Sequence, residues 1–175
     1  MNTSVATITA ELERRGLLER KRNCHPDREI ARVAELLGRE LPHDLAAFYG
    51  QSVARIGDFQ SITLHWNDYV GWRSPDEYVT QLVNVDAVPI FYDGCGSVYG
   101  LDLTPGVENP AVYFFDHESG FGRADWAAGS SLARFLLLLA DQHRSYEEGW
   151  PQKWQLKIDP DIERCPRAPA IWGAG

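Results

Sequence analysis

The sequence has few cysteines, no long apolar run and, over its central part, very little positive charge. Only Cys24, Cys95 and Cys165 occur among the 175 residues, and no two of them form a Cys-x-x-Cys pair. Widely spaced thiols in an odd number argue against a disulfide framework and against a zinc site built on cysteine. The longest apolar run covers only residues 135–140. A membrane-spanning helix needs about 20 such residues, so we expect no membrane span.

The N-terminal sequence Met-Asn-Thr-Ser-Val-Ala-Thr-Ile contains neither the basic segment nor the apolar segment of a secretory signal. Together with the scarcity of cysteine, this indicates the reducing environment of the cytoplasm. We therefore expect a cytoplasmic protein that does not associate with membranes.

Positive charge is scarce in the part of the sequence that otherwise is typical of a folded core. The formal net charge is −8, and residues 39–148 hold sixteen acidic but only six Lys or Arg side chains. Between Gly57 and Gly122, Arg73 is the only Lys or Arg. A surface built from these residues would repel phosphate, which disfavours direct binding of nucleic acid. It favours a cationic protein partner, although acidity of this size also serves solubility alone.

Apolar and aromatic residues, by contrast, are plentiful. They make up 44% and 11% of the chain, which indicates a globular protein and not a disordered one. The length of the chain and the changes in its composition along the sequence suggest three parts. We expect an N-terminal helical arm over residues 1–26, the main domain over residues 27–148, and an extended tail rich in Pro and Trp over residues 149–175 that packs on the domain.

Apolar residues recur at helical spacing in several segments, and each segment is bounded by residues that cap or break helices. Residues 135–139 of the last segment are apolar nearly all round, which predicts a deeply buried helix. The predicted helices cover residues 8–22, weakened by Gly16; 28–37, capped by Asp27 and ended by Gly38; a segment whose first residue is Pro42; 74–83; and 132–146, capped by Ser130 or Ser131.

Short apolar runs closed by turn residues predict strands that follow one another as an antiparallel meander. Residues 93–96, Asp-Gly-Cys-Gly, form a turn in which the glycines supply positive φ. Pro89 restricts its strand to a start or an edge position. The fold class is thus α+β, a mainly antiparallel twisted sheet packed by helices. The predicted strands cover residues 60–66, 88–92, 98–103 and 111–116.

Four polar residues lie at the ends of neighbouring predicted strands: Asp93, Asp102, Asp116 and His117. If they converge, they form an acid–base pair or hold a metal. The alternative is that Asp93 and Asp116 accept backbone hydrogen bonds in turns. We favour the alternative because each of these two residues opens a turn, where aspartate is commonly chosen for backbone hydrogen bonding. Other catalytic or nucleotide-binding patterns are not evident: no base accompanies Cys95, no Gly-x-Ser-x-Gly elbow occurs, and the glycines follow no phosphate-loop spacing. The sequence therefore predicts no catalytic residue, no metal and no cofactor.

Three segments, in this order, resemble the SUKH superfamily, which includes fungal cell-wall-assembly regulators and many bacterial immunity proteins. Residues 30–49 read as a helix, a Leu-Gly stop, Leu-Pro and a second helix. Residues 88–118 contain Val-Pro-Ile, Gly-Ser-Val-Tyr-Gly-Leu-Asp-Leu and Pro-Ala-Val-Tyr-Phe-Phe-Asp-His-Glu, and residues 131–139 read Ser-Leu-Ala-Arg-Phe-Leu-Leu-Leu-Leu. The chain departs from the pattern at residues 54–59, where an Asn-Gly-Gly-like turn is usual. The first 26 residues and those after Gly149 lie outside the resemblance.

The resemblance implies a non-enzymatic α+β protein. Bacterial members bind and block toxin domains, often nucleases, whereas eukaryotic members look like regulatory interaction modules. A nuclease must be positive to hold phosphate, so an acidic surface suits such a partner. Two alternatives stay open: a regulatory scaffold, and a small hydrolase or metal-dependent enzyme built on the four polar residues above. The predicted partner-binding residues are Asp58, Asp68, Asp93, Asp102, Asp116 and Glu118, with Trp72 as an aromatic anchor.

Overall fold

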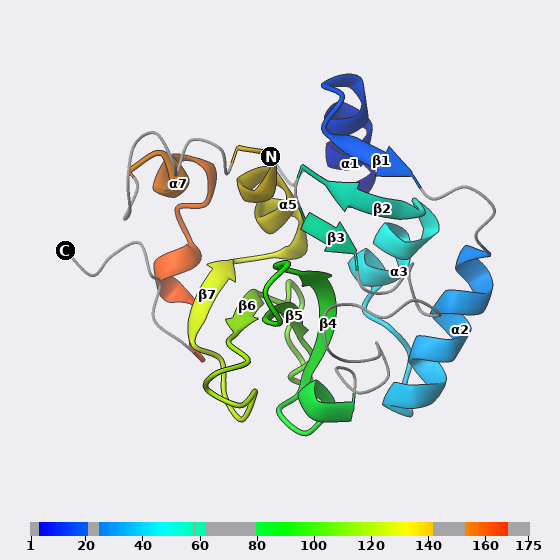
Figure 1. The fold of residues 1–175 in the computed structure, drawn as a ribbon, viewed down its shortest axis with the longest axis vertical. Helices are drawn as coiled ribbons and strands as arrows, with labels where there is room; N and C mark the ends of the chain where they lie inside the picture. The colour runs from blue at the N-terminus through cyan, green and yellow to red at the C-terminus, as the bar shows by residue number, and fades with distance from the viewer. Residues whose placement is uncertain (1–3, 21–24, 58, 62–79, 142–152, 168–175) are drawn as a thin grey trace.

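The computed structural model of the chain describes residues 4–20, 25–57, 59–61, 80–141 and 153–167. Within these ranges the chain forms a seven-stranded sheet in which each strand pairs antiparallel with the next one in the sequence (Figure 1). The α+β fold class with a mainly antiparallel sheet is therefore confirmed. The strands are β1 (Leu18–Arg20), β2 (Val53–Ile56), β3 (Phe59–Ser61), β4 (Ala87–Tyr92), β5 (Val98–Asp102), β6 (Val112–Phe115) and β7 (Trp126–Gly129).

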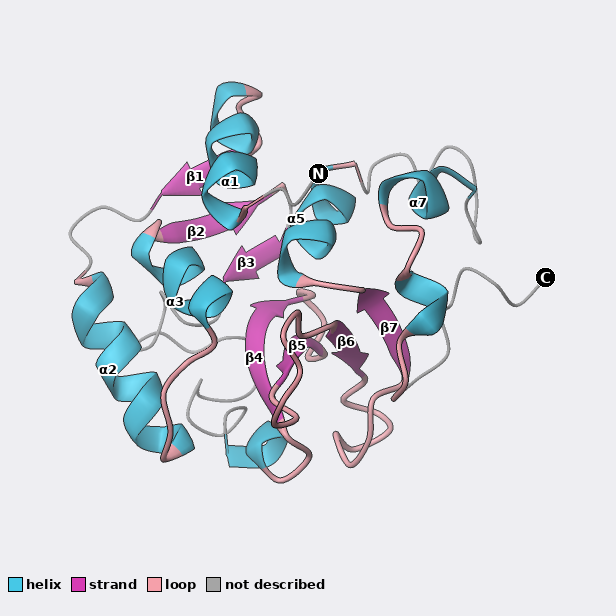
Figure 2. Cartoon of the chain, turned by 180° about the vertical axis from the view of Figure 1, so that it is seen from behind, coloured by secondary structure: helices cyan, strands magenta, loops and turns pink. Residues whose placement is uncertain are grey.

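Helices α1, α3 and α5 lie over the same face of the sheet (Figure 2), and the main core is buried between them and the strands. Leu12, Phe48 and Phe135 are all nearly inaccessible to solvent there. In the described part of the chain, no helix is both long and apolar enough to span a membrane. The helices are α1 (Val5–Arg14), α2 (Pro26–Leu37), α3 (His43–Gly50), α5 (Leu132–Ala140), α7 (Lys153–Ile158) and the 3₁₀ turn η2 (Ile162–Arg164), and residues 80–83 are helical as well.

The N-terminal segment belongs to both the core and the sheet. Ser4 caps α1 by accepting a hydrogen bond from the backbone of Thr7. The helix ends before Gly16, which adopts a left-handed φ of +70°. The predicted helix over residues 8–22 is therefore wrong in its C-terminal part, because Leu18 instead opens strand β1 and pairs with β2.

The next two helices begin close to the predicted positions. α2 begins at Pro26, so Asp27 lies in its first turn and does not cap it. α3 begins at His43, with Pro42 as the residue before it and not as its first residue. Gly38 ends α2 as predicted, with a left-handed φ of +63° that a side chain would disfavour.

The predicted hairpin and the third strand of the meander are confirmed as β4, β5 and β6. Gly94 and Gly96 in the hairpin turn have φ values of +90° and +112°. Pro89 is the third residue of β4, so it does not lie at the strand start. β4 has a neighbouring strand on each side, and its described pairing with β3 involves Phe91 and Tyr92. The pairing with β5 is irregular between Pro89 and Phe91. A bulge of this kind accommodates a residue that lacks a backbone N–H.

Strands β2 and β7 are not evident from the sequence. Each has four residues, and both contain alanine, which favours strands only weakly. Other predicted elements are only partly described: the strand over residues 60–66 up to Ser61, and the helix over residues 74–83 from residue 80 onward. The helix capped by Ser131 is confirmed and ends at Ala140.

The described part of the C-terminal segment packs on the domain as expected, but it forms helical turns in α7 and η2 and is not extended. Trp154 and Ile162 are buried in a second apolar cluster. The fully buried Asp159 carboxylate accepts hydrogen bonds from the backbone and the hydroxyl of Ser130, at 2.6 and 2.5 Å. Arg134 donates to the carbonyl of Ile158 at 2.6 Å. Polar and apolar contacts therefore both hold this segment against the start of α5.

Gly129 is the point where β7 touches α5. A Cβ added there would lie 2.7–2.9 Å from the Cβ, Cα and backbone nitrogen of Phe135. Because backbone atoms cannot move aside cheaply, we expect Gly129→Ala to lower the free energy of unfolding by about 1–3 kcal/mol in urea denaturation. Gly122→Ala is the control, because a Cβ there meets nothing within 4 Å, and it should change stability by less than about 0.5 kcal/mol. Equal stability of the two variants would contradict this account of the contact.

Candidate partner-binding surface

Two connections leave the same end of the sheet. The register pairs Tyr92 of β4 with Val98 of β5, and Val98 with Phe115 of β6. Because neighbouring strands are antiparallel, β4 and β6 both end where β5 begins. The β4–β5 turn and the β6–β7 loop therefore bring Asp93 and Asp116 to one end of the sheet.

The Asp93 carboxylate closes the β4–β5 turn. Its Oδ1 accepts hydrogen bonds from the backbone N–H groups of Cys95 at 2.7 Å and Ser97 at 3.0 Å. This is the turn role that the sequence favoured for Asp93. Both donors are neutral, so the turn orients the carboxylate without cancelling its charge.

Ser97 links the turn to the β6–β7 loop. Its hydroxyl donates to Oδ1 of Asp116 at 3.2 Å, and the same oxygen accepts the backbone N–H of Glu118 at 2.9 Å. Across the loop, Oδ2 of Asp125 accepts the backbone N–H of Asp116 at 2.8 Å and the hydroxyl of Ser119 at 2.9 Å. Four acids thus lie on two connections that hydrogen bonds hold together.

We define the acidic end of the sheet by Asp93, Asp116, Glu118 and Asp125. Glu118 is exposed and the other three are partly buried. Among the described residues, none of the four pairs with a Lys or Arg side chain. Arg123 is the only Lys or Arg between residues 80 and 133, so negative charge predominates there. Asp125 was missed because it directly precedes β7, the strand that the sequence does not reveal.

Partly exposed aromatic rings adjoin the acidic end. Phe114 and Trp126 stack across β6 and β7 with their centroids 4.7 Å apart. The ring centroid of Tyr99 lies 5.2 Å from that of Phe114 and 5.7 Å from that of Phe59. The row formed by Phe59, Phe114 and Trp126 is half-buried against the core. It adds apolar surface beside the carboxylates, and aromatic side chains are common near the centres of protein interfaces.

Three of the predicted partner-binding residues, Asp58, Asp68 and Trp72, lie outside the described residues. Their part in binding stays a prediction.

The arrangement around His117 does not form a catalytic relay. Its Nδ1 lies 2.9 Å from the hydroxyl of Ser97 and 3.4 Å from Oδ1 of Asp116. Both groups face the same ring nitrogen, whereas a relay uses one nitrogen for the hydroxyl and the other for the carboxylate. Ser97 is also only 2% exposed, so its hydroxyl does not face a substrate.

Asp102 lies at the opposite end of β5 from the acidic end. It lies four residue steps along the strand from Val98, which corresponds to roughly 13 Å. Asp102 therefore does not converge with Asp93, Asp116 and His117, as the enzyme alternative requires, and the favoured turn role of Asp93 is the one observed. In the described ranges, no group of three or more His, Cys, Asp or Glu side chains could hold a metal ion.

Asp102 is also buried and already paired. It is 3% exposed, and its Oδ1 accepts hydrogen bonds from Nη1 of Arg167 at 2.7 Å and from the hydroxyl of Thr104 at 2.7 Å. The prediction that Asp102 faces a partner on one surface with Asp93 is wrong for this reason. The predicted single acidic surface divides into a partly exposed group of carboxylates at one end of β5 and a buried ion pair at the other.

A family comparison supports the fold and its organisation. The sequence model of the SMI1 / KNR4 family (SUKH-1) matches residues 26–137, from the start of α2 into α5. The chain belongs to the SMI1 / KNR4 family. A comparison with curated proteins found no match. The resemblance carried by the three sequence segments is thus confirmed, and the four residues of the acidic end all lie within the matched range.

Two segments of this SUKH-1 protein lie outside the matched range and complete its described structure. At the N-terminus, α1 and β1 add a helix to the core and a strand to the edge of the sheet. At the C-terminus, residues 153–167 pack beside β7 and α5 and end at the Asp102–Arg167 pair.

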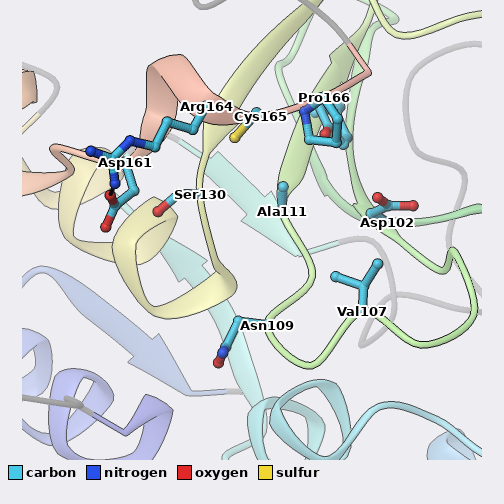
Figure 3. A pocket seen from close by; sticks show the side chains of 10 residues that line it. Asp102, Val107, Asn109, Ala111, Ser130, Asp161, Arg164, Cys165 and Pro166 are labelled. Atoms are coloured by element: carbon cyan, nitrogen blue, oxygen red, sulfur yellow. Dashed lines mark hydrogen bonds and ion pairs between the residues drawn. The ribbon is translucent and has the colours of Figure 1, made fainter.

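A cavity of about 230 Å³ lies between the C-terminal segment and the sheet, with Asp102 on one side and Asp161 and Arg164 on the other (Figure 3). Cys165 and Tyr113 also line it. Burial, together with nearby carboxylates, raises the pKa of Cys165 to about 11, and burial raises the pKa of Tyr113 to about 12. Both groups are therefore held in their neutral, protonated forms at physiological pH.

The turn role of Asp93 predicts a difference between two substitutions. Asp93→Ala removes the acceptor for two backbone N–H groups, so we expect the free energy of unfolding to fall by about 1–3 kcal/mol. Asp93→Asn keeps an oxygen acceptor and removes the charge, so it should lie within about 1 kcal/mol of wild type. Urea denaturation measures both. Equal destabilisation by the two variants would show that charge, and not the turn bonds, makes the contribution.

The raised pKa of Cys165 predicts a dependence of stability on alkaline pH. The pKa of the thiol is about 8.5 in the unfolded chain and about 11 in the folded one. The folded state therefore holds the proton more tightly, and this contribution to stability is complete below about pH 8.5 and lost as pH rises toward 11. We expect Cys165→Ser to flatten the fall of Tm between pH 8.5 and 11. An unchanged slope, or alkylation of native Cys165 with a midpoint near 8.5, would contradict the raised pKa.

Proposed function

We propose that this SUKH-1 protein is a non-enzymatic immunity protein of the cytoplasm, which neutralises a basic toxin domain by binding it through the acidic end of the sheet. Membership of the SMI1 / KNR4 family supports an immunity or regulatory role. The acidic end supports the choice of a cationic protein as the partner. A nuclease domain fits this chemistry because its own surface must be positive to hold phosphate.

The observation that carries the proposal is the way the acids are held. Asp93, Asp116 and Asp125 accept hydrogen bonds from backbone N–H groups, with serine hydroxyls as further donors to Asp116 and Asp125. Neutral donors fix the carboxylates in place and leave their charge available to a partner. A preorganised group of like charges raises the rate of encounter with a cationic surface and needs little ordering on binding.

The adjoining aromatic row gives the interface an apolar component. Phe114 and Trp126 are already packed against each other, so few rotamers are lost when a partner covers them. Aromatic rings also attract the cationic side chains that the carboxylates select. We therefore propose that the partner lays Lys or Arg side chains over the acidic end and part of its surface over this row.

The partner to test first is the protein encoded by the gene beside this one, because immunity proteins act on toxins made with them. Co-expression should protect cells from that protein, and the two should co-purify at low salt but separate as salt is raised. Absence of a toxic neighbour, or binding that is insensitive to salt, would contradict the immunity role.

Charge removal at the acidic end should weaken this complex. The triple variant Asp93→Asn, Asp116→Asn and Glu118→Gln removes three charges and keeps hydrogen-bonding side chains. We expect the association rate with the partner to fall about tenfold or more at low salt, with a smaller dependence on salt. Surface plasmon resonance at several salt concentrations measures both.

The matched control removes three exposed acids elsewhere: Asp27→Asn, Glu35→Gln and Glu163→Gln. Two of these lie on α2, which Figure 1 shows on the far side of the molecule from β6 and β7. The control should change the association rate less than threefold. If both triple variants lose the same amount, net charge and not the acidic end drives binding. A partner that binds without toxicity would favour the regulatory role.

A further inference from the structure

The Arg167 side chain fills a site made for a guanidinium group. Its Nη1 donates to Oδ1 of Asp102 at 2.7 Å and to the carbonyl of Asp86 at 3.1 Å. Its Nη2 donates to the carbonyl of Val85. The guanidinium carbon also lies 5.7 Å from the centre of the Tyr113 ring. We call these four groups, the Asp102 carboxylate, the Asp86 and Val85 carbonyls and the Tyr113 ring, the arginine socket.

The Asp102 and Asp86 walls of the socket are also held by hydrogen bonds within the sheet and its adjoining turn. Asp102 is held by the backbone N–H of Thr104 at 3.0 Å as well as by its hydroxyl. The Asp86 carbonyl also accepts the backbone N–H of Leu103 at 2.7 Å. All four socket groups come from residues 85–113 of the sheet and its adjoining turn, inside the family match, whereas Arg167 comes from outside it.

The socket suits arginine better than lysine. Its acceptors bind two different terminal nitrogens of one planar group, and a ring lies beside that plane. Arginine presents several N–H donors in a fixed fork and stacks on aromatic rings, whereas an ammonium is a single point of charge. The three N–H donors of a lysine all leave one nitrogen, so a lysine does not span acceptors that bind two different nitrogens of the fork.

The occupant is open to exchange. The Arg167 side chain is 25% exposed, while that of Asp102 is 4% exposed, so solvent reaches part of the arginine side chain and almost none of its carboxylate partner. The earlier part of the C-terminal segment has its own anchors at Asp159 and Trp154. These anchors do not involve Arg167, so displacement of its side chain does not require them to break.

We propose that the arginine socket is an arginine-recognition site, filled in cis by Arg167, which an arginine side chain of the protein partner takes over in the complex. The takeover by a partner rests on the proposed function, whereas selective binding of a guanidinium does not. A tethered ligand has an effective concentration in the millimolar range or above. A partner therefore displaces Arg167 only with the help of contacts elsewhere, such as those at the acidic end.

The first test is chemical rescue of the full-length Arg167→Ala variant. Its buried Asp102 carboxylate lacks the guanidinium, so its Tm should be below that of wild type. L-arginine amide at millimolar concentrations should bind saturably in calorimetry and raise the Tm, and L-lysine amide, of equal charge, should do neither. The double variant Asp102→Asn and Arg167→Ala should respond to neither amide. An equal response to both amides, or none to arginine amide, overturns the proposal.

The second test keeps the chain folded and needs no rescue. Cys165 lies two residues from Arg167 and is half-buried, so its labelling rate reports opening of the socket. In a chain with Cys24→Ser and Cys95→Ser, Arg167→Lys should raise the rate of Cys165 labelling at least fivefold. If Cys165 is labelled at the same rate with lysine as with arginine at position 167, the socket does not recognise the guanidinium group. That result would overturn the proposal.

The same labelling separates this proposal from the proposed function. If the partner binds and Cys165 labelling speeds up, the takeover is supported. If the partner binds and labelling is unchanged or slower, the takeover is wrong although the proposed function stands. If no basic partner binds, the takeover fails together with the proposed function, and the amide experiment alone decides whether the socket recognises arginine.

Discussion

The antiparallel pairing of β5 with β4 and β6 decides where the candidate side chains lie. β5 has five residues, and both of its neighbours run opposite to it. Residues just before Val98 therefore lie beside the C-terminal ends of β4 and β6. Residues just after Asp102 lie beside the N-terminal ends of these two strands. Residues that lie within a short stretch of sequence are thus separated by the length of a strand. The acidic end and the arginine socket are two results of this one register.

Carboxylates at the two ends of β5 are held in different ways and serve different physical purposes. At the acidic end, neutral donors orient Asp93 and Asp116 and leave their charge exposed to solvent or a partner. In the arginine socket, Asp102 is removed from water and depends on Arg167, because a buried unpaired carboxylate is costly. Exposed acids therefore favour steering and encounter, whereas the buried one favours recognition of a particular cation.

The segments outside the family match take part in the same structure. α1 buries Leu12 in the main core and β1 extends the sheet past β2. The C-terminal segment is anchored through Asp159 and Trp154 before it reaches the socket. A family core with additions at both ends thus keeps the shared meander, while the additions decide what lies at its edges.

The sequence by itself determined the elements whose signals are local. Apolar runs and turn glycines specify the β4–β5 hairpin, Gly38 specifies the end of α2, and a serine at 130 or 131 specifies the start of α5, because each depends on neighbouring residues alone. It also determined the family and the excess of acid. Only the tertiary structure decided that Leu18 begins a strand, that β7 exists, that Asp125 joins the acidic end and that Asp102 is buried. Each of these depends on a partner distant in the sequence, β2, β6 or Arg167, and local residue patterns carry no information about such contacts.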